Sequence, residues 1–70
     1  MKYIAIFLSS RDVIKCDKHC RAAQIRCRIV PVPEKYSSSC GMSIEFEGEE
    51  HQRFVELTKK IDLEVLIYEK

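Results

Sequence analysis

The sequence predicts a single α+β domain with elements in the order βαββαβ, and three observations support this prediction. The 70 residues suffice for one small domain only, so residues 1–70 are expected to form a single domain. Two glycines and two prolines leave few positions suited to loops, so most of the chain is expected to be regular structure. Apolar residues recur at strand spacing in four segments and at helical spacing in two.

The first half of the chain predicts a strand, a helix and a second strand. Residues 2–8 are apolar on both faces and rich in aromatic and β-branched side chains, which is typical of a central strand. Residues 11–24 carry apolar side chains at helical spacing and follow two serines suited to cap a helix. Residues 25–32 alternate as a strand, and Pro31 and Pro33 favour a sheet edge because proline donates no ladder hydrogen bond.

The middle of the chain predicts one long loop followed by a third strand. Residues 33–39 form the loop, which leads to Cys40 and Gly41. Residues 43–47 alternate between apolar and acidic side chains, as a half-exposed strand does.

The last third of the chain predicts a second helix and a closing strand. Gly48 is expected to turn the chain. Residues 49–60 place Phe54 and Leu57 on one helical face and begin with acidic residues, which favour a helix N-terminus. Residues 63–68 form the closing strand.

This order has one economical packing, the ferredoxin-like fold, with two helices on one face of a four-stranded antiparallel sheet. The first and third strands are then central, and the second strand lies at an edge. The same topology gathers one helix start, one helix end and the long loop at one end of the sheet. Cys40 is therefore expected near Ser9, Ser10, Arg11, Lys35, Lys59 and Lys60. Nearby cations and a helix N-terminus favour a thiolate.

The other three cysteines predict packing residues. Cys16, Cys20 and Cys27 occupy inward positions of a helix and a strand, where a free thiol packs as a small apolar group. Cys16 and Cys20 are four residues apart, which separates their Cβ atoms by about 5–6 Å, more than the ~3.8 Å of a disulfide. A metal site is not expected either, because zinc motifs need a second, closely spaced pair of ligands.

The charge distribution argues against a nucleic-acid partner. Residues 1–40 hold eight Lys or Arg against three Asp or Glu, and residues 41–70 hold four against eight. We expect these halves to form two faces or ends of the domain. Nucleic-acid binders usually show an overall basic excess, whereas the net charge here is +1. Glu45 and Glu47, expected to point outward from the third strand, would repel phosphate.

The longest apolar run, residues 3–8, is too short for a membrane span, which needs about 20 apolar residues. Lys2 is the only basic residue before this run and no small-residue cleavage site follows it, so a signal peptide is not expected either. We therefore expect a cytoplasmic protein with reduced cysteines and no membrane partner.

The ring residues are assigned structural roles. His51 is expected to be solvated, and no histidine near Cys40 in sequence supports a Cys-His hydrolase. Tyr3 and Tyr68 are expected to reach the uncovered sheet face, as rim packing or as a dimer contact.

The segment Ser37-Ser38-Ser39-Cys40-Gly41, preceded by Pro31-Val32-Pro33, carries a family resemblance. Together with the order of elements, it resembles the small prokaryotic selenium/sulfur carrier-like family over nearly the whole chain. Ser38, Ser39, Cys40 and Gly41 carry the family's site pattern. The family commonly has glycine where this chain has Gln24, so a different cap is expected at the end of the first helix.

The resemblance implies a carrier and not a turnover enzyme. Cys40 would hold sulfur or selenium as a persulfide or selenopersulfide, in a turn formed with Ser38, Ser39 and Gly41, and Arg11, Lys59 and Lys60 would support the thiolate electrostatically. The implied partners are a cysteine desulfurase or another sulfur- or selenium-relay protein, and no cofactor is expected. One alternative is a non-catalytic interaction or regulatory module that dimerises through the open sheet face. A thiol redox sensor is a third possibility, but it needs a resolving cysteine, and none is well placed.

Overall fold

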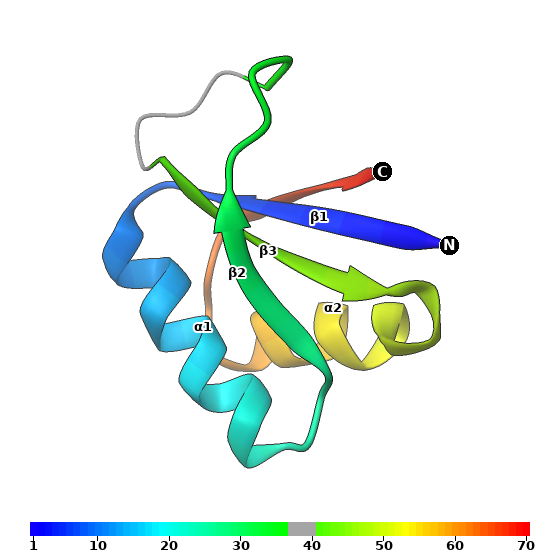
Figure 1. Ribbon diagram of the computed structural model, residues 1–70. Helices are drawn as coiled ribbons and strands as arrows, with labels where there is room; N and C mark the ends of the chain where they lie inside the picture. Colours follow the sequence, from blue (N-terminus) through cyan, green and yellow to red (C-terminus); the bar gives the residue numbers. More distant parts are fainter. Residues whose placement is uncertain (37–40) are drawn as a thin grey trace.

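The computed structural model describes residues 1–36 and 41–70. Its elements follow the predicted order, with a short 3-10 turn before the second helix (Figure 1). They are β1 (Lys2–Phe7), α1 (Ser10–Ala22), β2 (Cys27–Pro31), β3 (Met42–Glu47), η1 (Gly48–Glu50), α2 (His51–Lys60) and β4 (Val65–Glu69).

The strands form one antiparallel sheet in the order β2-β3-β1-β4, and both helices lie on the same face of it (Figure 1). This arrangement confirms the predicted ferredoxin-like α+β fold. The first and third strands are central, and the proline-containing second strand is at an edge, as the sequence predicts.

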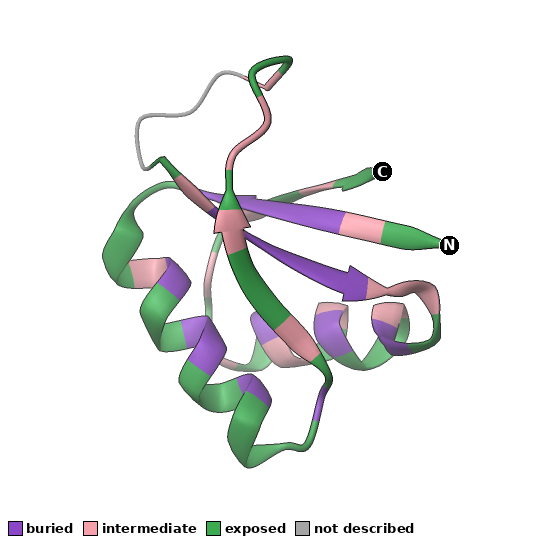
Figure 2. Ribbon diagram, viewed as in Figure 1, coloured by how far each residue is buried: buried purple, intermediate pink, exposed green. Residues whose placement is uncertain are grey.

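The core lies between the helices and the sheet face that they cover (Figure 2). Phe54 of α2 is fully buried and stacks on Phe46 of β3, with ring centroids 4.1 Å apart. Burial of such a side chain contributes roughly 1.5–3 kcal/mol. Leu57, expected in this face, is only half-buried, and the next residue, Thr58, is buried. The Thr58 hydroxyl is satisfied there because it donates to the Val55 carbonyl at 2.9 Å.

Both helices end in a left-handed residue that is not glycine. After α1, Gln24 has φ 60°, and the N–H groups of Gln24 and Ile25 donate to the carbonyls of Arg21 and Cys20. These two hydrogen bonds form a Schellman motif. Asp62, with φ 57°, ends α2 in the same way. The expectation of a different cap at Gln24 is therefore wrong, because the backbone of Gln24 adopts the left-handed conformation that usually favours glycine.

β2 begins two residues later than predicted because the backbone before it is bonded elsewhere. Ile25 belongs to the helix cap, and the N–H of Arg26 donates to a carboxylate oxygen of Glu50 at 2.8 Å. Arg53 contacts the same carboxylate and also donates to the Ala23 carbonyl at 2.6 Å. Glu50 and Arg53 thus fasten the start of α2 to the connection between α1 and β2.

Two expectations about ring residues are wrong. Tyr3 faces the helices, where it stacks on Phe46 with ring centroids 5.7 Å apart. His51 is half-buried, and its ring centroid lies 4.7 Å from that of Tyr3. Tyr3 pairs with Phe46 across the sheet, and side chains of paired residues point to the same face. The first turn of α2 therefore covers Tyr3 with His51.

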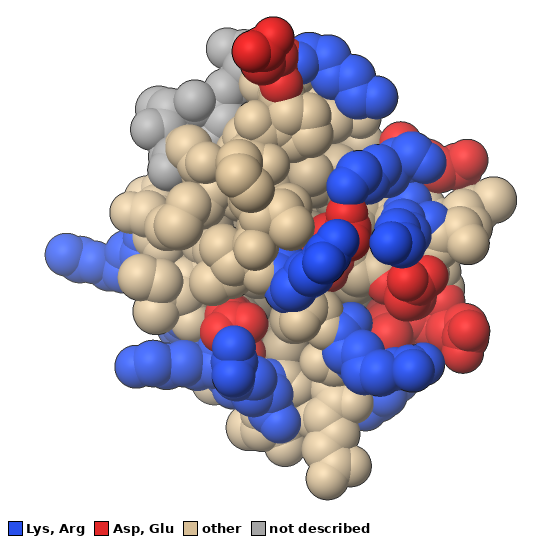
Figure 3. All heavy atoms as spheres, viewed as in Figure 1, with Lys and Arg blue, Asp and Glu red and all other residues tan. Residues whose placement is uncertain are grey.

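The oppositely charged halves of the sequence do not separate into two faces. Ion pairs join Lys2 and Arg28 to Glu45, and Arg26 to Glu49. Figure 3 shows basic and acidic side chains interspersed over the face in view. The reason is that antiparallel pairing of β2 with β3 brings residues from the two halves side by side.

Candidate functional site

The base of the β2–β3 hairpin holds Gly41, the one described residue of the Ser38-Ser39-Cys40-Gly41 pattern. Gly41 lies opposite Val32, whose N–H donates to the Gly41 carbonyl at 3.3 Å. Gly41 is exposed, and its φ of 71° is a left-handed conformation that side chains disfavour. Cys40, Ser38 and Ser39 lie outside the described residues.

Several chain segments meet at the end of the sheet where Gly41 is located. The register pairs Ile6 with Ser43 and Phe7 with Val65, so β1 ends where β3 and β4 begin. α1 follows β1 directly, and α2 ends shortly before β4. This end therefore holds the residues that topology predicts there, namely Ser9, Ser10, Arg11, Lys59 and Lys60.

The side chains at this end leave positive charge exposed to solvent. The Ser9 hydroxyl caps α1 by accepting from the N–H of Asp12 at 3.3 Å. Arg11, Lys59 and Lys60 are exposed, and none of them forms an ion pair with another residue of the described segments. Cations that have no ion-pair partner favour a nearby anion such as a thiolate. That they surround Cys40 stays a prediction.

Lys35 and Tyr36 of the connection after β2 pack differently from the cations at the sheet end. Tyr36 stacks on Tyr68 of β4, with ring centroids 4.4 Å apart, and the Lys35 ammonium lies 5.2 Å from the Tyr36 ring centroid. Tyr68 pairs with Ile4 on the sheet face away from the helices. Tyr68 therefore reaches the open face as expected, but Tyr36 covers it, which no local pattern in the sequence indicates.

Cys16, Cys20 and Cys27 form a cluster of free thiols beneath the sheet. Cys16 and Cys20 are fully buried, with their Sγ atoms 4.0 Å apart, and Cys27 is half-buried on β2. The hydrogen bond with Cys16 is the main cause that raises the pKa of Cys20 to about 12. The hydrogen bond with Cys20, together with burial, raises the pKa of Cys27 well above its usual range. The raised pKa values keep Cys20 and Cys27 protonated at neutral pH, which makes these two thiols poor nucleophiles.

Within the described segments, no group of three or more His, Cys, Asp or Glu side chains is arranged to hold a metal ion. The helices in those segments are also too short and too polar to cross a membrane.

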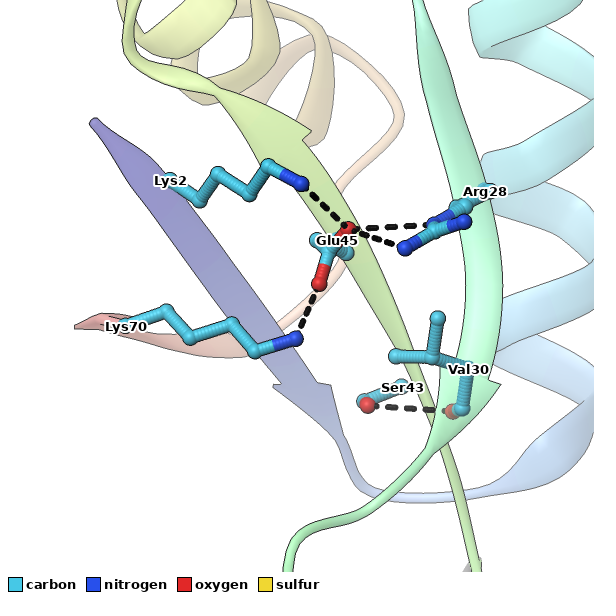
Figure 4. Close-up of polar contacts among 6 residues, drawn as sticks. All are labelled: Lys2, Arg28, Val30, Ser43, Glu45 and Lys70. Atoms are coloured by element: carbon cyan, nitrogen blue, oxygen red, sulfur yellow. Dashed lines mark hydrogen bonds and ion pairs between the residues drawn. The ribbon is translucent and has the colours of Figure 1, made fainter.

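Glu45 is a buried charged side chain whose environment no local sequence pattern indicates. It points to the open face, as predicted, but is only 5% exposed because Lys2, Arg28 and Lys70 converge on its carboxylate (Figure 4). Arg28 donates to it through Nε at 3.0 Å and Nη2 at 2.9 Å. The Lys70 hydrogen bond, followed by those of Arg28, lowers the pKa of Glu45. Arg28 lies directly opposite Glu45 in the hairpin, so this ion pair can be predicted once the register of β2 and β3 is known.

The fold and the hairpin base define a small ferredoxin-like domain that presents a glycine turn and exposed cations at one end of its sheet. Comparison with known families places this chain more narrowly. It belongs to the family described as "Putative Se/S carrier protein-like", whose model matches residues 2–69. No curated protein and no solved structure gave a significant match to the chain.

Proposed function

We propose that this protein is a sulfur or selenium carrier that holds a persulfide or selenopersulfide on Cys40 and relays it between enzymes. Family membership over residues 2–69 supports the carrier class. The observation that points to Cys40 is the state of the other thiols. Cys16, Cys20 and Cys27 share one internal cluster, and the pKa values of Cys20 and Cys27 are raised. Cys40 is the remaining cysteine of the sequence.

The proposed loading step is a thiolate exchange. The Cys40 thiolate attacks the outer sulfur of a persulfide on the donor enzyme, and a new S–S bond forms on Cys40. The donor S–S bond breaks, and its electron pair leaves with the donor thiolate. The exchange consumes no oxidant. Unloading is the same kind of exchange, in which an acceptor thiolate attacks the outer sulfur on Cys40 and the Cys40 thiolate leaves. A cysteine desulfurase or another relay protein would be the donor.

The residues at the sheet end support this chemistry in distinct ways. Gly41 supplies a left-handed backbone conformation next to Cys40 in the chain. Ser38 and Ser39, which lie outside the described residues, precede Cys40 in the family's site pattern. Arg11, Lys59 and Lys60 contribute positive potential that favours the thiolate over the thiol. Because these cations are exposed, each contributes only a small part of that effect.

The test is incubation of the full chain with a cysteine desulfurase and free cysteine, followed by mass spectrometry. We expect a gain of one sulfur atom that a reductant removes, located by peptide mapping on Cys40. The Cys40→Ser variant should fold and fail to load. The matched control is Cys27→Ser, which changes a thiol of the internal cluster and should load as the wild type does.

Two results would contradict the carrier. Cys40→Ser that loads as well as the wild type would place the sulfur elsewhere, and a wild type that loads at no cysteine with several donors would favour the interaction module. Arg11→Glu and Lys59→Glu should slow loading without abolishing it.

A further inference from the structure

The two edges of the sheet differ in how well they are protected against pairing with another strand. β2 carries Arg28 and ends at Pro31, and both charged side chains and proline discourage edge pairing. β4 has the sequence Val-Leu-Ile-Tyr-Glu, without proline or an interior charge. Leu66 is 61% exposed there, and Tyr68 is 38% exposed. Such an edge favours the addition of a further strand.

The backbone of β4 has free hydrogen-bonding groups on its outer side. In the sheet of the described residues, β4 has a neighbour on one side only, namely β1. The N–H of Lys70 donates to the Lys2 carbonyl at 2.8 Å. Because ladder bonds of antiparallel strands alternate, Leu66 and Tyr68 also bond to β1, whereas Val65, Ile67 and Glu69 direct their N–H and C=O groups outward.

An apolar groove runs beside the same edge. It has a volume of about 720 Å³ and lies between the end of α2, the end of β1 and β4. Its apolar lining includes Phe7, Leu8, Val55, Leu63, Val65 and Ile67. An added strand would therefore meet apolar side chains as well as backbone donors and acceptors.

We propose that β4 pairs antiparallel with β4 of a second copy of this chain, about a two-fold axis at Ile67. In this register Val65 lies opposite Glu69 of the second copy, and Ile67 lies opposite its own equivalent. The outward N–H and C=O groups of these residues then bond to one another. The two sheets become one continuous sheet of eight strands.

Charge complementarity identifies a second copy as the occupant. In this register Glu64 lies opposite Lys70 of the second copy, and the two-fold axis repeats the pair. Glu64 is exposed and forms no ion pair with a described residue. Lys70 contacts Glu45, but an ammonium has three donors and retains capacity for a second carboxylate. Between these charges, exposed Leu66 meets exposed Tyr68 of the second copy.

The antiparallel arrangement has a consequence for the carrier. β4 starts at the sheet end that holds Gly41, so the two-fold axis turns the two Gly41 ends in opposite directions. Each copy then presents its own end to a partner without obstruction by the other. The dimer rests on the β4 edge and not on the proposed function, although Tyr36 of the connection after β2 stacks on Tyr68 of that edge.

The test is sedimentation velocity of the full chain over a range of concentrations. We expect a reversible monomer–dimer equilibrium in the wild type. Glu64→Lys places two lysine pairs across the axis and should weaken dimerisation about ten-fold, and Lys70→Glu should do the same through two glutamate pairs. An equimolar mixture of the two variants restores both opposite-charge contacts and should form a heterodimer with affinity near the wild type.

Leu66→Glu should abolish the dimer, and Ile29→Glu on the opposite edge is its matched control and should leave the dimer intact. Circular dichroism checks that each variant is folded. A wild type that stays monomeric at millimolar concentration overturns the proposal, as does a dimer that Leu66→Glu leaves unchanged. A mixture of charge variants that fails to associate overturns the proposed register. Sulfur loading of the monomeric Leu66→Glu variant separates the two proposals, since the carrier should load without the dimer.

Discussion

At Gly41 the backbone conformation, rather than a lack of space, requires glycine. A Cβ atom at this position would have no described heavy atom within 4 Å, but φ is 71°. A left-handed conformation costs a residue with a side chain about 1–2 kcal/mol. Glycine here therefore fixes the direction in which the chain leaves the hairpin base.

We expect Gly41→Ala to lower the free energy of unfolding by about 1 kcal/mol, measured by urea denaturation. Gly41→Asn is the matched control and should cost less, because asparagine adopts the left-handed conformation more readily. Equal stability of the alanine variant and the wild type would show that the turn does not need glycine. The alanine variant should also load sulfur more slowly if the turn orients Cys40.

The thiol cluster gives a second prediction for individual residues. In the native protein at pH 8, alkylation should modify Cys40 and leave Cys16, Cys20 and Cys27 unmodified, because the last three are wholly or partly buried and the pKa values of Cys20 and Cys27 are raised. In denaturant all four should react. Peptide mass mapping distinguishes the sites, and rapid native labelling of Cys20 or Cys27 would contradict the cluster.

Individual residues differ in how far the sequence predicts them. The inward positions of Cys16 and Cys20 follow from helical spacing alone. The burial of Glu45 does not, because it depends on Lys2 and Lys70, which lie at opposite ends of the chain. Only the strand order brings these lysines together, and alternation along β3 predicts the direction of the Glu45 side chain without its surroundings.

At the level of single elements, both helices end in a residue other than glycine whose backbone has the disfavoured left-handed conformation. Gln24 adopts φ 60° after α1 without the conformational freedom of glycine. Gln24→Gly should raise the free energy of unfolding by about 0.5–1 kcal/mol, since it removes left-handed strain and adds a smaller entropic cost. The control Lys18→Gly, in the interior of α1, should lower it by about 1 kcal/mol. If thermal or urea unfolding shows that Gln24→Gly is less stable than the wild type, the backbone of Gln24 is not strained.

The sequence predicts the types of the elements more accurately than their boundaries, for a physical reason. Periodicity locates β2, but its first residue depends on whether Arg26 bonds to a neighbouring strand or to Glu50. Glu50 is 24 residues away in the sequence, so no local pattern decides between these partners. Likewise, acidic residues correctly mark the start of the second helical segment, but they do not show that its first turn is the 3-10 turn Gly48–Glu50.

At the level of the whole molecule, the Glu45 carboxylate joins three separate parts of the chain. Lys2 comes from the start of β1, Arg28 from the edge strand β2, and Lys70 from the chain end after β4 (Figure 4). All three cations are partly exposed, whereas the carboxylate is buried. The ion pairs therefore cover the part of the open sheet face around Glu45, and this part is not a free apolar surface.

This arrangement makes part of the stability dependent on pH. The pKa of Glu45 is lowered by Lys70 and Arg28 from its usual value of 4.5. A carboxyl group with a depressed folded-state pKa contributes stability that is fully present above the unfolded value and is lost as the pH falls through the folded value. Glu45→Gln removes the charge and should lower the free energy of unfolding at pH 7 by about 1–2 kcal/mol, because hydrogen bonds to a charged group are lost.

The difference between the wild type and Glu45→Gln should stay constant from pH 7 down to about pH 5 and then narrow as Glu45 of the wild type takes up its proton. Urea denaturation at several pH values measures it. Glu47→Gln is the matched control, since Glu47 lies on the same strand and face without an ion pair to a described residue. Glu47→Gln should change stability by less than about 0.5 kcal/mol at every pH. A Glu45→Gln deficit that is equally large at pH 3 and pH 7 would mean that the carboxylate acts through its shape and not its charge.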